Sequence, residues 1–99
     1  MPSAALREQV LKDAWIGDAV LALWARKRIL AENGRVDGEK YIRLTSNQFL
    51  NSLGEPSEVE ARIGRVYQSE GPEAAEAWIE REILPMFEKQ QAKRGRRGR

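Results

Sequence analysis

The stretch AWIGDAVLALWA, residues 14–25, decides how the chain folds, because it is highly apolar and carries a single charge, the carboxylate of Asp18. On a helix, Asp18 shares its face with apolar residues three, four and seven positions away. The opposite face is apolar too, whereas a surface helix would be charged there. The stretch therefore predicts a core helix that also forms a subunit interface, through Trp15, Ile16 and Val20.

The flanking sequence has helical spacing almost throughout, and no stretch alternates with the period of a strand. Ser3 can cap a first helix that ends near Glu32, at the Asn33-Gly34 pair, either unbroken or as two helices that break near Asp13. Three further helices are predicted, from Asp37 or Gly38 to Gly54, from Pro56 to Gly71, and from Pro72 to a kink or end at Pro85. The predicted fold class is all-α.

The composition excludes several kinds of chemistry. The 99 residues suffice for one domain, and they include neither cysteine nor histidine. Disulfides, thiolate nucleophiles, Cys-based zinc sites and histidine bases are therefore excluded. Catalysis would rest on carboxylates, hydroxyls, lysine or an oxygen-bound metal ion such as Mg²⁺ or Mn²⁺. The apolar stretch is shorter than the roughly 20 residues that cross a bilayer, and no secretory signal is recognisable, so we expect a cytoplasmic protein without a membrane partner.

Charge is distributed unevenly along the chain. Residues 1–88 carry a net charge of −4, whereas residues 89–99 carry +6. We expect residues 1–88 to form the helical domain and residues 89–99 to be a disordered basic tail, because the tail cannot bury apolar surface. The tail could contact RNA phosphates, or it could only be a solvated segment. Its basic residues are Lys89, Lys93, Arg94, Arg96, Arg97 and Arg99.

Asp18 needs a partner if its helix is buried, because a lone buried carboxylate costs on the order of several kcal/mol. An ion pair with Arg62 or Arg65, a cap on another helix, or a metal ion would each satisfy it. Glu60 raises the same question, because its helix face is uncharged and mostly apolar. Each acid also has a glycine on its helix, Gly17 or Gly64, where another backbone could come close.

Two like-charged acids that converge in a dry site repel each other unless a cation neutralises them. Mg²⁺ characteristically takes one or two carboxylates, together with waters and substrate phosphates. Asp18 and Glu60 together therefore favour a metal site for phosphodiester chemistry more than either acid does separately.

Four segments resemble the ribonuclease III family. WIGDAVLALWARKRIL, residues 15–30, is similar to its motif E-x-x-E-F-L-G-D-A-V-L, and EPSEVEARIGRVYQSEG, residues 55–71, to D-x-F-E-A-L-I-G-A-I-Y-L-D-x-G. Between them, LTSNQFLNSL, residues 44–53, resembles the segment L-V-S-N-x-x-L. EAAEAWIEREILP, residues 73–85, follows as the family's last helix does. The motifs stand in the family's order and cover most of residues 8–85.

The resemblance implies an all-helical endonuclease domain that acts on double-stranded RNA as a homodimer, with Mg²⁺ held by four acids per protomer. By position, Asp18 and Glu60 match two of these acids and are the implied metal ligands and catalytic residues. Ala14 and Ser57 stand where the other two would be. Similar replacements occur in the Mini-III ribonucleases, a small branch without a double-stranded-RNA-binding domain, so the loss of two acids does not by itself imply loss of activity.

The chain departs from the family in length. Only 41 residues separate Asp18 from Glu60, so about one helix is missing after Gly54, in a region that helps the family hold RNA. Arg65 also occupies a position that is normally small and apolar. In the family, the positions of Ser46 and Asn47 face the site, where they could orient water or contact RNA. They could equally be polar residues of a helix surface.

Two functions follow from these features. The first is a Mg²⁺-dependent endoribonuclease that cleaves double-stranded or structured RNA through attack by a metal-activated water. The second is a catalytically weak or inactive dimer that binds structured or ribosomal RNA, which is recognised mainly by shape and backbone. A plain protein-interaction module would leave Asp18 and Glu60 unexplained. Trp15, Trp24 and Trp78 fit a core or an interface better than base stacking.

Overall fold

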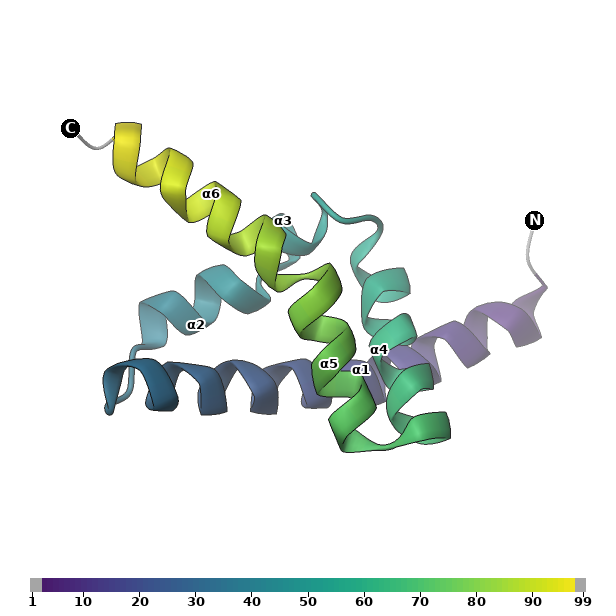
Figure 1. The fold of residues 1–99 in the computed structure, drawn as a ribbon. Coiled ribbons are helices and arrows are strands. Elements are labelled where there is room, and N and C mark those ends of the chain that lie inside the picture. Colours follow the sequence, from purple (N-terminus) through teal and green to yellow (C-terminus); the bar gives the residue numbers. More distant parts are fainter. Residues whose placement is uncertain (1–2, 98–99) are drawn as a thin grey trace.

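The longest element is α1 (Ala4–Asn33), which runs the length of the molecule in the computed structural model (Figure 1). The hydroxyl of Ser3 caps α1 by accepting a hydrogen bond from the backbone N–H of Leu6 at 3.2 Å. Gly34 ends the helix in the left-handed conformation, with φ of 69°. The predicted start and end of the helix are confirmed. Because α1 is unbroken, the alternative of two helices that break near Asp13 is wrong.

The predicted second helix is two helices, α2 (Gly38–Thr45) and α3 (Asn47–Leu50). Asp37 caps α2, as predicted, but the backbone of Ser46 is extended, with ψ of 150°. The Ser46 hydroxyl accepts a hydrogen bond from the N–H of Phe49 at 3.1 Å and so caps α3. A serine side chain offers the backbone this alternative to continuing a helix, and the helical spacing of apolar residues does not reveal the break.

The second half of the chain folds into α4 (Pro56–Glu70), α5 (Pro72–Glu82) and α6 (Leu84–Arg97). A proline lies in the first turn of α4 and of α5, where its missing N–H costs no helical hydrogen bond. Ile83 separates α5 from α6. Pro85 therefore lies near the start of a new helix instead of ending the chain's last one.

The structure describes residues 3–97, with side chains described to residue 93. In this range the chain is entirely α-helix and connecting turns, which confirms the all-α prediction. Residues 89–97, which we expected to be disordered, continue α6 as helix away from the body (Figure 1). The expectation for residues 98–99 lies outside the described range. No helix among the described residues is long and apolar enough to cross a membrane.

Helix α4 crosses α1 at the point where a glycine from each helix meets the other backbone (Figure 1). A Cβ atom added to Gly17 would overlap the carbonyl oxygen of Glu60 and lie 2.9 Å from the backbone nitrogen of Gly64. A Cβ atom added to Gly64 would overlap the carbonyl oxygen of Asp13. The close backbone approach predicted from these two glycines is therefore confirmed.

The core is formed where α1, α2, α3, α4, α5 and the start of α6 face one another. Trp24 is buried there, and its indole N–H lies 3.5 Å from Oε1 of Glu80 on α5. Lys27 and Glu76 join the same two helices by an ion pair of 2.9 Å. The other large side chains of this core cluster are Leu21, Leu44, Phe49, Leu50, Val59, Ile63, Ile79, Ile83 and Phe87.

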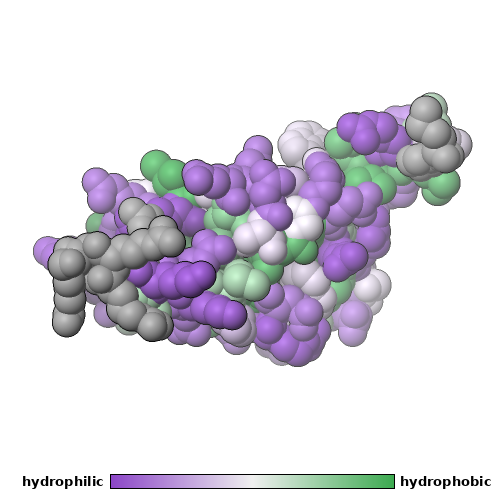
Figure 2. Space-filling view, turned by 90° about the horizontal axis from the view of Figure 1, so that it is seen from above, coloured by the Kyte–Doolittle hydropathy of each residue, from purple (hydrophilic) through white to green (hydrophobic). Residues whose placement is uncertain are grey.

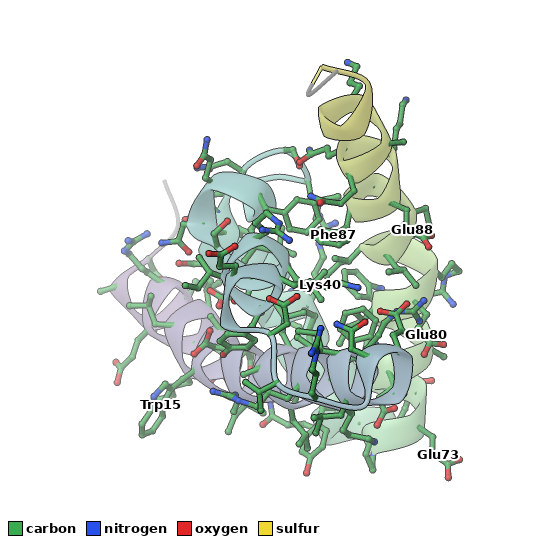
Figure 3. All side chains as sticks on the ribbon, turned by 90° about the vertical axis from the view of Figure 1, so that its left-hand side faces the viewer. Trp15, Lys40, Glu73, Glu80, Phe87 and Glu88 are labelled. Carbon is green, nitrogen blue, oxygen red and sulfur yellow. The ribbon has the colours of Figure 1, made fainter. Side chains whose placement is uncertain are left out.

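Helix α1 is not buried all round within one chain, and the side that the chain leaves open is where we expected a subunit interface. The side of α1 away from the core leaves Trp15 78% exposed and Leu23 59% exposed, and Trp15 projects away from the body in Figure 3. The N-terminal end of α1 extends past α4 in Figure 1, and Figure 2 shows apolar surface on this projecting end. The apolar character of α1 thus exceeds what its own chain covers.

The glycine contact can be tested by Gly17→Ala. The added Cβ has no room unless α1 and α4 move apart, so the free energy of unfolding should fall by at least about 2 kcal/mol. For a domain of this size that corresponds to a melting temperature lower by roughly 10 °C, measured by circular dichroism.

The matched control is Gly38→Ala, because no atom lies within 4 Å of a Cβ added to Gly38. This variant should be neutral or more stable by up to about 1 kcal/mol, through the smaller entropy of its unfolded chain. Equal melting temperatures for the two variants would contradict the close crossing.

Candidate functional site

The α1–α4 crossing brings Asp18 and Glu60 together. Asp18 follows Gly17 on α1, and Glu60 lies one turn before Gly64 on α4, so both acids flank the glycine contact. Asp18 lies close enough to Glu60 for a proton on one carboxyl group to bond to the other. Such a bond needs a proton on one of the two groups, because two ionised carboxylates can only accept.

The pKa of Glu60 is raised to about 8, first because burial disfavours its charged form, and then because of the hydrogen bond and the charge of Asp18. The charge of Glu55 adds a smaller effect in the same direction. Glu55 was missed by the sequence analysis. It caps α4, where its Oε2 accepts a hydrogen bond from the N–H of Glu58 at 2.9 Å, and its position directly before Pro56 was the available signal.

Two carboxylates that hold one proton between them are a fitting donor set for a divalent cation, which can take the place of that proton. Mg²⁺ needs only one or two carboxylates, because waters and substrate phosphates complete its ligands. Among the residues that the structure describes, no group of three or more acids has the arrangement of a metal centre. Asp18 and Glu60 would therefore be its two protein ligands.

Asp18 is exposed, so the argument that its burial demands a partner does not hold within one chain. The described residues include no ion pair between Asp18 and Arg62 or Arg65, and Asp18 caps no described helix. The group that the structure places beside Asp18 is the carboxyl group of Glu60. Glu60 is only partly exposed and lies at the edge of the crossing, so a ligand that reaches Asp18 meets both carboxyl groups.

The buried acid of α1 is Asp13, which the sequence analysis did not single out. Asp13 is 7% exposed, and its carboxylate accepts hydrogen bonds from Gln68 at 3.1 Å, Arg65 at 3.2 Å and Gln9 at 3.2 Å. Arg65, which looked out of place beside the family pattern, therefore neutralises Asp13 across the two helices. Asp13 lies one turn before Gly17, and that spacing was the signal for its position at the crossing.

The positions of the two missing acids differ in their surroundings. Ala14 is 7% exposed and packs in the protein interior, so this position supplies apolar contact. Ser57 lies one turn before Glu60 on α4 and is partly exposed. The site thus consists of two carboxylates with Glu55 nearby.

The other predicted site residues lie in two further places. Ser46 is occupied as the cap of α3 and lines a groove between α3 and α6, while Asn47 is exposed in the first turn of α3. Lys89 and Lys93 are exposed on α6. Outside the described residues lie Arg99 and the side chains of Arg94, Arg96 and Arg97.

The residues of the predicted dimer interface lie on one exposed side of α1. Trp15 and Ile16 are exposed, and Val20 is partly buried. Ile16 and Val20 line an apolar groove of about 250 Å³ together with residues of α4 and α5, among them Tyr67.

The comparisons with known proteins leave the family open: no protein-family model, curated protein or solved structure matches this chain. The class of fold that the structure establishes is all-α. The resemblance to ribonuclease III, which rests on the sequence motifs, stays a prediction.

The raised pKa of Glu60 predicts how stability depends on pH. Between pH 4.5 and about 8 the folded protein keeps the Glu60 proton that the unfolded chain releases, so this group's contribution to stability falls as pH rises and is lost above about 8. Glu60→Gln should therefore raise the melting temperature relative to wild type at pH 8.5, and do so less at pH 4. Glu70→Gln, an exposed change on the same helix, serves as the control.

A divalent cation should offset this loss of stability at high pH. Because Mg²⁺ binds the ionised pair, it should raise the melting temperature of the wild type more at pH 8 than at pH 5, and leave Glu60→Gln nearly unchanged. A pH-independent difference between wild type and Glu60→Gln would contradict the shared proton.

Proposed function

We propose that this protein is a Mg²⁺-dependent endoribonuclease that cleaves double-stranded or structured RNA, with an activity of the ribonuclease III type. The observation that carries the proposal is the meeting of Asp18 and Glu60 at the glycine contact between α1 and α4. Both acids match acids of the family motif. The close crossing fixes the relative position of the two acids, because the backbones of α1 and α4 are in contact beside them.

The chain's own residues would act as ligands and as a proton store. Asp18 is open to solvent, so a phosphodiester can approach the pair from outside. Glu60 would release its proton when a cation binds, because the positive charge stabilises the ionised carboxylate that burial and the neighbouring Asp18 disfavour. When bound, Mg²⁺ supplies positive charge beside the scissile phosphate and acidifies water. The Asp13–Arg65 pair would hold α4 in place against α1 during this change.

A homodimer forms the second part of the proposal. The exposed side of α1 presents Trp15, Ile16 and Leu23, and Tyr67 of α4 lies on the same apolar groove as Ile16 and Leu23. Large apolar patches on a small protein commonly mark an interface. A second copy that pairs along this side of α1 would cover the apolar residues that the core leaves out.

A second function is favoured by the small number of ligands. The site has two carboxylates where the family motif has four, and Ala14 is packed in the interior. If the pair binds its metal too weakly for catalysis, the protein would be a dimer that binds structured or ribosomal RNA without cutting it. The two functions differ in one measurable property, cleavage.

Cleavage of a long RNA duplex by the purified protein tests the proposal. The wild type should cut with Mg²⁺ or Mn²⁺ and not with EDTA, and Asp18→Asn and Glu60→Gln should each lower the rate at least about 100-fold, since even outer partners of metal ligands are worth about 10–100-fold. Glu70→Gln should cut at the wild-type rate. Products would be resolved on a denaturing gel.

The variants must keep the fold and the RNA affinity for this result to count, which circular dichroism and binding in EDTA establish. If the wild type binds the duplex but leaves it intact with both metals, the enzyme proposal fails and the second function takes its place.

The dimer is tested by sedimentation of Trp15→Ser. Removing a large aromatic from an interface costs about 2 kcal/mol or more, so the dimer dissociation constant should rise roughly 30-fold or more. Ile42→Ser is the control, because Ile42 is also largely exposed but lies on α2. A monomeric wild type, or equal effects of the two substitutions, would contradict this interface.

A further inference from the structure

Two adjoining grooves separate α6 from α2 and α3, and both are lined by Arg43, Phe87 and Gln91. Phe87 lies between α6 and α2 in Figure 3. The groove beside α3 holds about 420 Å³, within the range of about 300–1,000 Å³ that small-ligand sites occupy. Its lining contains no acid and consists of Arg43, Ser46, Gln48, Phe49, Phe87, Gln90 and Gln91.

The cations along these grooves differ in how they are neutralised. Lys40 and Arg28 both pair with Glu32, at 2.8 Å and 3.4 Å. These contacts also hold the pKa of Glu32 below its usual value, chiefly through the hydrogen bond from Lys40. Arg43 makes no ion pair with any acid among the described residues.

The Nε atom of Arg43 is buried, and no described residue accepts its hydrogen bond. A partly buried guanidinium without a counter-charge is costly, because its desolvation is not offset by a partner. An anion in the groove would supply that missing charge. Glu88 lines only the groove beside α2, so the groove beside α3 is the one that suits an anion.

We propose that the groove between α3 and α6 binds a phosphate of an RNA backbone through Arg43. A guanidinium matches the paired oxygens of a phosphate. The amide groups of Gln48, Gln90 and Gln91 can donate to phosphate oxygens and can also accept from a ribose 2′-hydroxyl. The inference rests on the proposed function, because it names a place where the RNA substrate is held.

The aromatic lining of the groove and the positive charge on α6 also suit an RNA phosphate. Phe49 and Phe87 pack edge to face in the lining of the groove, with ring centroids 5.6 Å apart, and form its apolar side. On the other face of α6 from the groove, Lys89 and Lys93 are exposed. Their positive charge adds to the attraction of this end of the molecule for a nucleic-acid backbone.

Binding of a fluorescein-labelled RNA duplex, measured by anisotropy in EDTA at several salt concentrations, tests the proposal with the full chain. Arg43→Gln should weaken binding at least roughly fivefold and lower the slope of log K against log salt by about 1, the value for one lost phosphate contact. Arg43→Lys should lie between Arg43→Gln and wild type, because it keeps the charge without the guanidinium fork. Arg35→Gln, an exposed change of equal charge, should alter binding less than twofold and leave the slope unchanged.

A nitrogen-15 NMR titration of the wild type with the same duplex gives an answer even if Arg43→Gln fails to fold. The side-chain amides of Gln48, Gln90 and Gln91 should shift, whereas those of Gln9 and Gln68, which are bonded to Asp13, should not. If Arg43→Gln binds like Arg35→Gln, or if the groove amides do not shift, the groove proposal is overturned. Cleavage with Mg²⁺ would still decide the proposed nuclease function on its own.

Discussion

The contact of Gly17 and Gly64 with the opposite backbone is the constraint on which the rest of the structure depends. It allows the backbone of α4 to pack directly against the backbone of α1. This close packing matters in a short chain, because a small domain has few side chains with which to form a hydrophobic core. Any side chain at these two positions would push the helices apart. The crossing therefore sets both the packing of the core and the placement of the acids beside it.

Two polar clusters flank this crossing and have opposite characters. On one side Asp13 is buried, neutralised by Arg65 and bonded to two amide side chains, so it has little capacity left for a ligand. On the other side Asp18 and Glu60 meet without a cation among the described residues, and burial together with Asp18 raises the pKa of Glu60 to about 8. The first cluster ties the helices together, whereas the second holds unbalanced charge that a cation can neutralise. This difference is why we assign the chemistry to Asp18 and Glu60.

The sequence predicted those parts of the fold that local chemistry determines. The ends of the helices were predicted from local residues. They are set by caps at Ser3 and Gly34 and by the fixed backbone angles of Pro56 and Pro72, none of which depends on distant residues. The break at Ser46 was not predicted. The Ser46 hydroxyl accepts a hydrogen bond from the N–H of Phe49 and starts a new helix, whereas the spacing of apolar residues indicated one continuous helix. Charge and composition also give no indication that α6 continues through residues 89–97.

The site could be predicted in part for a related reason. Asp18 and Glu60 each stood out as an acid on an apolar helix face, so their meeting was expected. The burial of Asp13 was not foreseen, and Trp15 was assigned only to a core or an interface, because periodicity does not tell which side of an apolar helix its own chain will cover. Which side of α1 is covered depends on where α4 packs. The glycine contact shows that α4 lies over Asp13, and Trp15 is left exposed.

The proposed function depends on the Asp18–Glu60 pair binding a divalent cation. Anomalous X-ray scattering from crystals soaked in Mn²⁺ at pH 8 tests it most directly, because the ion is located without reference to activity. We expect a peak within ligand distance of both carboxylates in the wild type and none in Glu60→Gln. Well-ordered carboxylates without a peak, in crystals that bind Mn²⁺ elsewhere, would contradict it.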